Sequence, residues 1–429
     1  MTFPELQAEI GKNIYTEDDG MTRIALASIV ATRLQISDPV WLILIGPSSS
    51  GKSQVLRPLA LTDTKFIHRV DDLTENTLLS GVRTKKGEKD ISLLKRIGKL
   101  GIIVISDLTV IFSKGIEARA AILGQLRMVY DGEMTKFSGL SSEPITWNGS
   151  IGILAGSTPS IYSHFEEVAD MGERFIYYRM KNYDIEKATR RSLSREAYGK
   201  GLDEQISWLY AEYIKEAIVG IGEERVPSVS LAVNDRIVYI SMFAAMLRTP
   251  THYDKYQKTI DRVPVPEMPM RVAIQLTALA RGLMVLRHHD SPEGERSWEL
   301  SEEDIGYIEW CAYSLANEER RACLKVLAGI PFGTSVSGQT IADTVGLSTT
   351  IISMNLQHLA AIGILDRSAD GGSLKWSFKK KAEWEIVRRL EKIEDDISIV
   401  ERDLALEESE EQERAISEEF DRHQSSQQI

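Results

Sequence analysis

An eight-residue run rich in glycine and serine is the segment of this chain with the clearest chemistry. It reads Gly46-Pro47-Ser48-Ser49-Ser50-Gly51-Lys52-Ser53. Its glycines allow the backbone to wrap around a polyphosphate and to turn N–H groups toward it, and a following helix adds partial positive charge. Lys52 is expected to reach the β- and γ-phosphates, and Ser53 to hold Mg²⁺. The run therefore predicts a P-loop that binds ATP and Mg²⁺.

A carboxylate for the metal is expected at Asp107, which ends the apolar run 101–106. In this position it would hold Mg²⁺ through water, although a strand-capping aspartate has the same pattern. The next residue is Leu108, where a glutamate would orient the attacking water. Asp131 and Glu133 are alternatives for that role, or they are solvated loop charges. Slow ATP turnover therefore stays open.

Thr158 follows the apolar run 150–156. Ligands gather at the carboxyl ends of strands in open parallel sheets, so Thr158 is expected to sense the γ-phosphate or the attacking water. The alternative is a turn residue before Pro159.

These residues need a scaffold of buried strands. Continuous apolar runs at 40–45, 101–107, 150–156 and 174–178, with a short run at 65–68, are separated by helical patterns. Such runs are typical of a parallel sheet buried on both faces, which predicts an α/β fold. A helix is expected at 18–35, and residues 183–310 are expected to be helical with a proline-rich break at 250–269.

Composition sets broad limits on the function. The chain is 43% hydrophobic and 27% charged, has two cysteines, and shows no apolar run long enough for a membrane span. We expect a cytoplasmic protein without a membrane partner. Its net charge is −12, but residues 383–429 hold 16 acidic and 6 basic residues, so the rest of the chain is nearly neutral.

The order of these motifs resembles that in AAA+ ATPases. In particular, the chain is similar to the minichromosome maintenance-like helicases of phages and mobile genetic elements. The resemblance covers roughly residues 40–290 and includes five segments. They are the Walker A run 46–53, an insert at 79–100, a helix and hairpin at 123–139, the segment 171–175, and a sensor 2 helix at 268–281.

The resemblance implies roles for two arginines. Arg174 would be an arginine finger that reaches a neighbouring subunit's ATP, and Arg271 would be the sensor 2 residue. A finger acting between subunits implies a homo-oligomer, a hexamer by analogy with the family. The alternative for each arginine is a surface ion pair.

Four lysines are candidates for contacting DNA in a central pore. Lys85, Lys86 and Lys89 belong to a basic loop, and Lys136 lies in the predicted hairpin. Contacts of this kind bind the phosphates of a single strand without recognising its sequence. A solvated surface loop is the alternative.

The C-terminal region predicts a winged helix followed by an acidic tail. Residues 337–347 and 348–359 have the pattern of two helices, the second being the recognition helix, and 366–378 that of the wing. The recognition helix has no Lys or Arg, so contact with DNA and contact with a protein both stay open. Apolar residues repeat every three or four positions from Trp384 to Leu404, which indicates an amphipathic helix or coiled coil. The acidic tail could cover a DNA site, bind a partner or simply aid solubility.

Together these patterns predict five segments. They are an N-terminal helical segment (1–39), an ATPase core (40–182), a helical lid (183–315), a winged helix (316–382) and an acidic helical or disordered tail (383–429). The expected function is an ATP-dependent AAA+ motor, a ring-forming DNA helicase or replication protein of a phage or mobile element. The alternative is a non-translocating nucleotide switch, such as a loader, regulator or defence ATPase, that acts on a protein. A metabolic kinase is disfavoured by the helical lid and winged helix.

Overall fold

The computed structural model describes residues 1–12, 14, 18–80, 92–137, 144–164, 174–181, 184–195, 201–221, 226–250, 253–254, 259–260, 262–370, 373–394, 396, 398–403, 405–406 and 409. The chain forms two compact units. Unit 1 comprises Met1–Ala245 with Met268–Leu315, and unit 2 comprises Met246–Glu267 with Ala316–Ile429.

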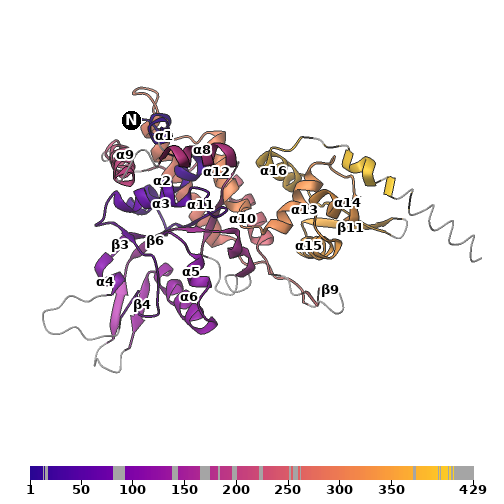
Figure 1. Cartoon of the computed structure of the whole chain (residues 1–429), viewed down its shortest axis with the longest axis horizontal. Coiled ribbons are helices and arrows are strands. Elements are labelled where there is room, and N and C mark those ends of the chain that lie inside the picture. Colours follow the sequence, from indigo (N-terminus) through magenta and orange to yellow (C-terminus); the bar gives the residue numbers. More distant parts are fainter. Residues whose placement is uncertain are drawn as a thin grey trace, which may run out of the picture. The chain divides into compact units, whose positions relative to one another are not determined.

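Unit 1 is built on a five-stranded parallel sheet, which confirms the predicted α/β class (Figure 1). Its strands occur in the order β2-β3-β6-β1-β7. Their bounds are β1 (Trp41–Ile45), β2 (Ile67–Arg69), β3 (Leu100–Ile105), β6 (Ser150–Ser157) and β7 (Ile176–Arg179). Every residue of β1 is buried, as expected for a strand covered on both faces.

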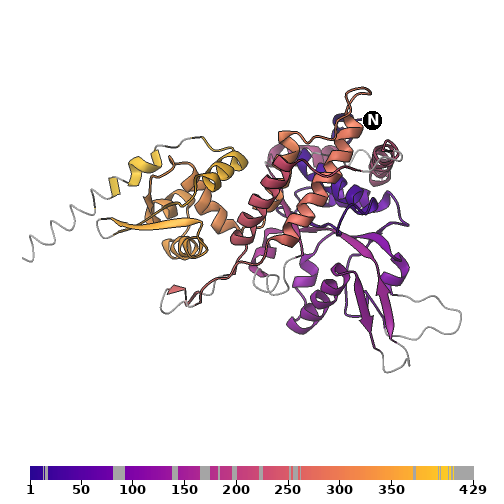
Figure 2. The same cartoon turned by 180° about the vertical axis from the view of Figure 1, so that it is seen from behind.

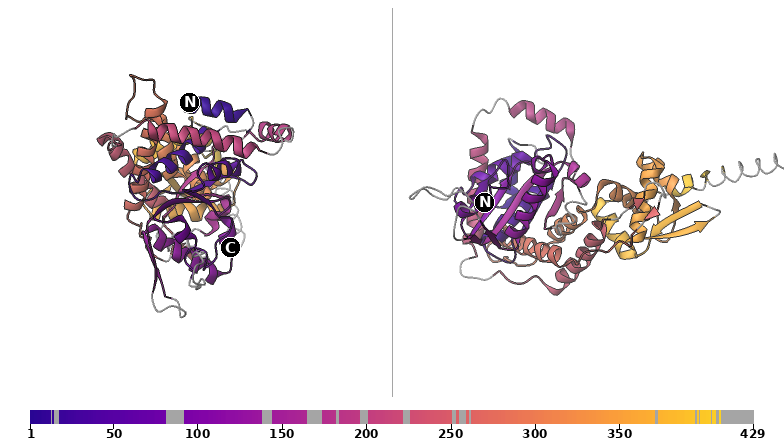
Figure 3. Two further views of the ribbon diagram at one scale, coloured as in Figure 1. Left: turned by 90° about the vertical axis from the view of Figure 1, so that its left-hand side faces the viewer. Right: turned by 90° about the horizontal axis from the view of Figure 1, so that it is seen from below.

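Helices cover both faces of this sheet (Figure 3). The helices that lie wholly or mostly in unit 1 are α1 (Phe3–Gly11), α2 (Asp19–Arg33), α3 (Lys52–Leu61), α4 (Leu93–Ile97), α5 (Thr109–Phe112), α6 (Ile116–Tyr130), the 3₁₀ helix η1 (Pro159–His164), α8 (Ile185–Arg195), α9 (Leu202–Val219), α10 (Leu231–Leu247), α11 (Met270–Asp290) and α12 (Glu302–Tyr313). None of the helices in the described part of the chain is long and apolar enough to cross a membrane.

Helix α2 is the central helix of unit 1 and is packed closely against α11. A Cβ atom on Gly282 of α11 would lie 2.3 Å from the carbonyl oxygen of Ala27, so only glycine allows this approach. Arg23 of α2 is buried, forms an ion pair with Asp290, and donates to the hydroxyl of Tyr213 at 3.1 Å. These contacts join α2, α9 and α11 into one layer.

A two-stranded antiparallel hairpin, β4 (Glu133–Lys136) and β5 (Ile145–Asn148), projects from the sheet (Figures 1 and 2). Trp147 of β5 is buried and donates through Nε1 to the carbonyl oxygen of Gly98 at 2.7 Å. The base of the hairpin is therefore fixed to the segment between α4 and β3.

Unit 2 contains a three-stranded antiparallel sheet with helices packed against it. Its strands occur in the order β10-β12-β11. Its elements are α13 (Glu318–Ala328), β10 (Val336–Ser337), α14 (Gly338–Val345), α15 (Thr349–Ala361), β11 (Leu365–Asp370), β12 (Ser373–Phe378) and α16 (Lys381–Glu391), with the short strands β8 (Tyr253–Asp254) and β9 (Thr259–Ile260). Asn317, Ser337 and Ser348 cap the N-termini of α13, α14 and α15 through their side chains.

The apolar repeat after Trp384 does not form one continuous helix. Helix α16 ends at Glu391, and Lys392 has a positive φ of 53°, which turns the chain. A second helical segment follows at 398–403. Val387 and Leu390 are buried in unit 2, so at these positions the repeat is used for packing within the chain.

Candidate functional site

The loop between β1 and α3 has the backbone geometry that wraps an anion. Gly51 has a φ of 90° and Ser49 a φ of 62°, both in the left-handed region. A Cβ atom on Gly46 would lie 2.8 Å from Ser50 Oγ and 3.0 Å from Met180 Sδ. Left-handed residues that alternate with residues of negative φ turn backbone N–H groups toward one point, and the N-terminus of α3 adds its dipole. Pro47, Ser48 and Ser49 form the exposed tip of the loop.

Lys52 is folded into this loop. Its Nζ donates to the carbonyl oxygens of Gly46 at 2.8 Å and Pro47 at 2.7 Å, and to Ser50 Oγ at 3.1 Å. Burial lowers the pKa of Lys52, and the nearby carboxylate of Asp107 partly offsets this. The ammonium group therefore lies at the loop, where it would donate hydrogen bonds to the oxygens of a bound phosphate.

Three strand ends bring the predicted site residues together. Because β6 lies between β3 and β1, Asp107, Thr158 and Gly46 follow adjacent carboxyl ends of the sheet. The backbones are in contact, since Leu108 N donates to Gly156 O at 2.7 Å and Gly46 N donates to Ser157 O at 3.2 Å. Thr158 therefore lies between the P-loop and Asp107.

The side chains of Asp107 and Thr158 also have local partners. Asp107 is exposed, and its Oδ1 accepts from Thr109 N at 2.9 Å and Thr109 Oγ1 at 2.6 Å, which starts α5. Thr158 Oγ1 is 2.6 Å from Ser160 Oγ in η1. Both alternatives that the sequence left open, a role at the site and a role in local structure, are compatible with these positions.

The residues of this edge fit ATP and Mg²⁺. The loop offers N–H groups and a buried ammonium to phosphates, Ser53 lies in the first turn of α3, and Asp107 is oriented by Thr109. Within the described residues, no group of three or more His, Cys, Asp or Glu forms a separate metal site. Magnesium in nucleotide sites needs none, because it is bound by one or two protein oxygens, substrate phosphates and waters.

The position after Asp107 carries no carboxylate that could take part. Leu108 is 2% exposed and packs into the core. Asp131 follows the far end of α6, where Tyr130 packs on Trp41 with ring centroids 5.2 Å apart. Trp41 begins β1 and the P-loop follows its end, so Asp131 lies at the opposite edge of the sheet. Asp131 is therefore not placed to orient water at the P-loop of its own chain.

Arg174 lies at this amino edge, just before β7. Its NH2 donates to both carboxylate oxygens of Asp131, at 3.0 Å and 2.9 Å, and its Cζ is 5.5 Å from the centre of the Tyr130 ring. Burial lowers the pKa of Arg174, the ion pair with Asp131 opposes this, and the nearby charges of Arg271 and Arg127 lower it further.

Arg271 is exposed in the first turn of α11, close enough to Arg174 and Tyr130 for its charge to act on both. The two predicted arginines thus belong to one cluster. Strand β1 separates this cluster, at the start of the strand, from the P-loop at its end. The four residue steps of β1 span about 13 Å at roughly 3.3 Å per residue. The cluster therefore lies at the end of β1 opposite to the P-loop of the same chain.

Gln275 of α11 is a residue that sequence analysis missed. Its Oε1 accepts from Trp41 N at 2.9 Å and its Nε2 donates to Arg174 O at 2.8 Å. It is buried and joins the start of β1 to the backbone of Arg174. An amide among apolar residues on α11 was the only sign of this role.

Of the four lysines considered for DNA, the structure describes one. Lys85, Lys86 and Lys89 lie outside the described residues, as do residues 171–173 and 138–139 of the motifs above. Lys136 Nζ donates to Asn76 Oδ1 at 2.9 Å, Leu79 O at 3.1 Å and Glu75 O at 3.3 Å. It therefore ties the hairpin to the segment that leads into the predicted insert.

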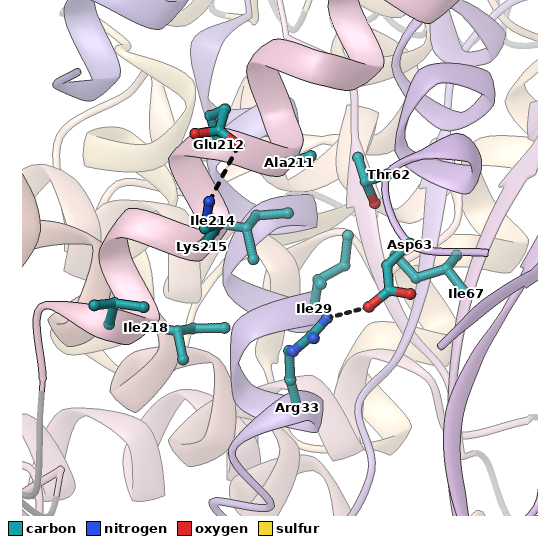
Figure 4. A pocket seen from close by; sticks show the side chains of 11 residues that line it. Ile29, Arg33, Thr62, Asp63, Ile67, Ala211, Glu212, Ile214, Lys215 and Ile218 are labelled. Atoms are coloured by element: carbon teal, nitrogen blue, oxygen red, sulfur yellow. Dashed lines mark hydrogen bonds and ion pairs between the residues drawn. The ribbon is translucent and has the colours of Figure 1, made fainter. Parts of the chain in front are cut away.

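A cavity of about 290 Å³ lies at the other end of α3 (Figure 4). It is bordered by α2, α9 and the residues after α3, with the ion pair of Arg33 and Asp63 (2.8 Å) on one side and Lys215 with Glu212 (3.6 Å) on the other. The length of α3, roughly 15 Å at 1.5 Å per residue, separates this cavity from Lys52. It is distinct from the P-loop.

No protein-family model matches the chain, and no curated protein matches its sequence.

Proposed function

We propose that this protein is an ATP-dependent AAA+ motor that assembles as a ring and acts on DNA. The observation that carries the proposal is the adjacency of three strand ends, which bring Lys52, Asp107 and Thr158 to one edge of the sheet. In this proposal Lys52 binds the phosphates, Ser53 and Asp107 hold Mg²⁺, and Thr158 senses the γ-phosphate.

The proposal of a ring is supported by the position of Arg174. An arginine that stabilises charge on the transferred phosphoryl group must reach the nucleotide. Arg174 and Arg271 lie at the edge opposite the P-loop, so the nucleotide they would contact belongs to a second copy of the chain. By family analogy we propose a hexamer, with α8–α12 as the lid.

In unit 2 we propose a winged helix, with α14 and α15 as the helix pair and β11–β12 as the wing. The order of helices and strands in unit 2 supports this. The exposed positions of α15, among them Thr350 and Ile351, are uncharged.

A second candidate function is a non-translocating nucleotide switch. It is favoured by Leu108, which is buried where a carboxylate would activate water, and by the uncharged surface of α15. A switch of this kind would bind ATP tightly, hydrolyse it slowly and engage a protein.

ATPase rates with and without single-stranded DNA distinguish the two. For the motor we expect hydrolysis that DNA stimulates and that Lys52→Ala and Arg174→Ala both abolish. Hydrolysis indifferent to DNA would favour the switch, and tight ATP binding with no hydrolysis would exclude the motor.

A further inference from the structure

The helical segment 398–403 packs against the rest of unit 2 and buries an acidic side chain. The side chain of Asp403 is 3% exposed. Its Oδ1 accepts hydrogen bonds from Ser337 N at 2.9 Å and from Thr340 Oγ1, and its Oδ2 lies 3.5 Å from Lys375 Nζ. The groups around this carboxylate thus come from β10, α14 and β12.

These three donors form an anion site that the fold of α14 does not require. The helix is already capped by its own serine, because Ser337 Oγ accepts from Thr340 N at 3.1 Å. Thr340 is 1% exposed and Lys375 8% exposed, so both polar groups are held in place by packing. Burial alone would raise the pKa of Asp403, but hydrogen bonds from Thr340 and Ser337 and the charge of Lys375 bring it below the usual value. Asp403 is therefore an anion at neutral pH.

We propose that this site takes a phosphate of a nucleic-acid backbone, and that Asp403 is a built-in competitor that fills it. A backbone N–H at a helix N-terminus, a hydroxyl and an ammonium are the donors with which proteins bind backbone phosphates. They would give a phosphate oxygen the same charge-assisted hydrogen bonds that Asp403 now receives.

The surroundings favour nucleic acid as the source of the phosphate. Ser337 pairs with Lys375 in the β10–β12 ladder, and the same sheet carries an exposed Arg367 and leads into exposed Lys379 and Lys380. Exposed cations elsewhere on and after this sheet suit a polyanion, which presents further phosphates along its backbone. Residues 383–429 have the opposite charge and belong to the same chain, so they compete at high effective concentration.

Two further contacts join the competing segment to the rest of unit 2. Asp396 N donates to Gly329 O at 2.9 Å, and Ile399 is buried near Gly329. In this proposal the segment leaves by local unfolding near the end of the chain, and the ligand takes the place of Asp403.

The inference depends on the DNA-binding part of the proposed function but not on ATP hydrolysis, so it is tested on the full chain without nucleotide. The probe is a fluorescent DNA duplex, followed by anisotropy over a range of salt concentrations. Asp403→Asn is compared with Glu401→Gln, which removes the same charge from an exposed position of the same segment. We expect Asp403→Asn to bind about tenfold more tightly than Glu401→Gln, with a salt slope steeper by about 0.9.

A double variant assigns the gain to the site. Adding Lys375→Ala to Asp403→Asn is expected to return the affinity to that of the wild type. Ile399→Ala, which loosens the segment but keeps Asp403, is expected to give a smaller gain that Lys375→Ala also removes. Thermal unfolding of each variant shows whether it is folded. If Asp403→Asn does not fold, Ile399→Ala takes its place in the comparison.

Equal affinities of Asp403→Asn and Glu401→Gln would overturn the inference, because the effect would then be general charge repulsion. A gain that persists without Lys375 would overturn it as well. If these variants show no specific gain in DNA affinity while DNA still stimulates ATPase activity, the proposed function stands. Only the inference of a phosphate site filled by Asp403 is then wrong.

Discussion

Arg174 and Asp131 form a two-point hydrogen bond at the amino edge of the sheet, with NH2 of the arginine 3.0 Å and 2.9 Å from the two carboxylate oxygens. The arginine side chain is 6% exposed, whereas that of Asp131 is 52% exposed. The guanidinium is thus held by a carboxylate that is itself open to solvent. A phosphate presented by a second chain would compete with Asp131 for the same donors.

Replacing this arginine by lysine tests whether the planar guanidinium matters or only its charge. Lysine keeps the charge but lacks the planar group with several N–H donors in a fixed arrangement. We expect Arg174→Lys to lower the ATPase rate by about 10³-fold, the lower end of the range for an arginine finger. The control is Arg33→Lys, which alters a half-exposed ion pair with Asp63 at the cavity of Figure 4. Full activity of Arg174→Lys would argue for a purely structural ion pair.

Nucleotide binding is expected to depend on Lys52 while the fold does not. The three contacts of its ammonium are all to atoms of its own loop. Saturating ATP and Mg²⁺, at about 100 times Kd, should stabilise the wild type by about 2.7 kcal/mol in thermal unfolding, and Lys52→Ala should lose this shift. Lys136→Ala is the matched control, because it should lower the melting temperature by freeing the hairpin yet retain the shift. A nucleotide shift in Lys52→Ala equal to that of the wild type would rule out the P-loop as the site.

The spacing of strands at the site is expected to depend on Gly156. A Cβ atom there would lie 2.6 Å from Ser106 O and 3.0 Å from Leu56 Cδ1. Gly156→Ala must therefore push β3 and β6 apart next to Asp107, at a cost of about 1–3 kcal/mol in unfolding free energy. Gly124→Ala, in α6 with nothing within 4 Å of the new Cβ, should stabilise by about 0.5–1 kcal/mol. Urea denaturation and ATPase rates measure both effects, and an active, fully stable Gly156→Ala variant would contradict this geometry.

Unit 2 is expected to lose stability in mild acid because of His358. Burial, with the nearby charge of Arg320, lowers the pKa of His358 to about 4. Its unfolded value is about 6.5, so below that pH the unfolded state binds the extra proton and is favoured. Between pH 7 and pH 5 the loss is about 2 kcal/mol. Urea denaturation at both pH values should show a smaller decrease for His358→Gln than for the wild type, and an identical decrease would exclude His358 as the cause.

The parts predicted from sequence are those with strong local patterns. Continuous apolar runs located the strands of the parallel sheet, and the glycine-rich run located the loop before α3, because both patterns depend on neighbouring residues. The pairing of Arg174 with Asp131 could not be predicted, since the two are 43 residues apart and meet only in the folded chain.

Other features depend equally on long-range packing. Gln275 connects β1 to Arg174 from a distant helix, and Asp403 reaches its partners because the chain turns at Lys392. Lys136 was considered for DNA because of its charge and its place in the predicted hairpin, but its side chain has backbone acceptors that no local pattern reveals. The strand ends and the P-loop were therefore accessible from sequence, whereas the contacts around them were not.

The most direct test of the central claim mixes two inactive variants. Lys52→Ala lacks a working P-loop but keeps Arg174, and Arg174→Ala keeps its P-loop but lacks the arginine. If Arg174 acts on the nucleotide of a neighbouring chain, mixed assemblies contain interfaces with both groups intact, and ATPase activity should return on mixing. If the mixture stays as inactive as its components although the variants co-assemble, Arg174 does not act between chains and the proposed motor is contradicted.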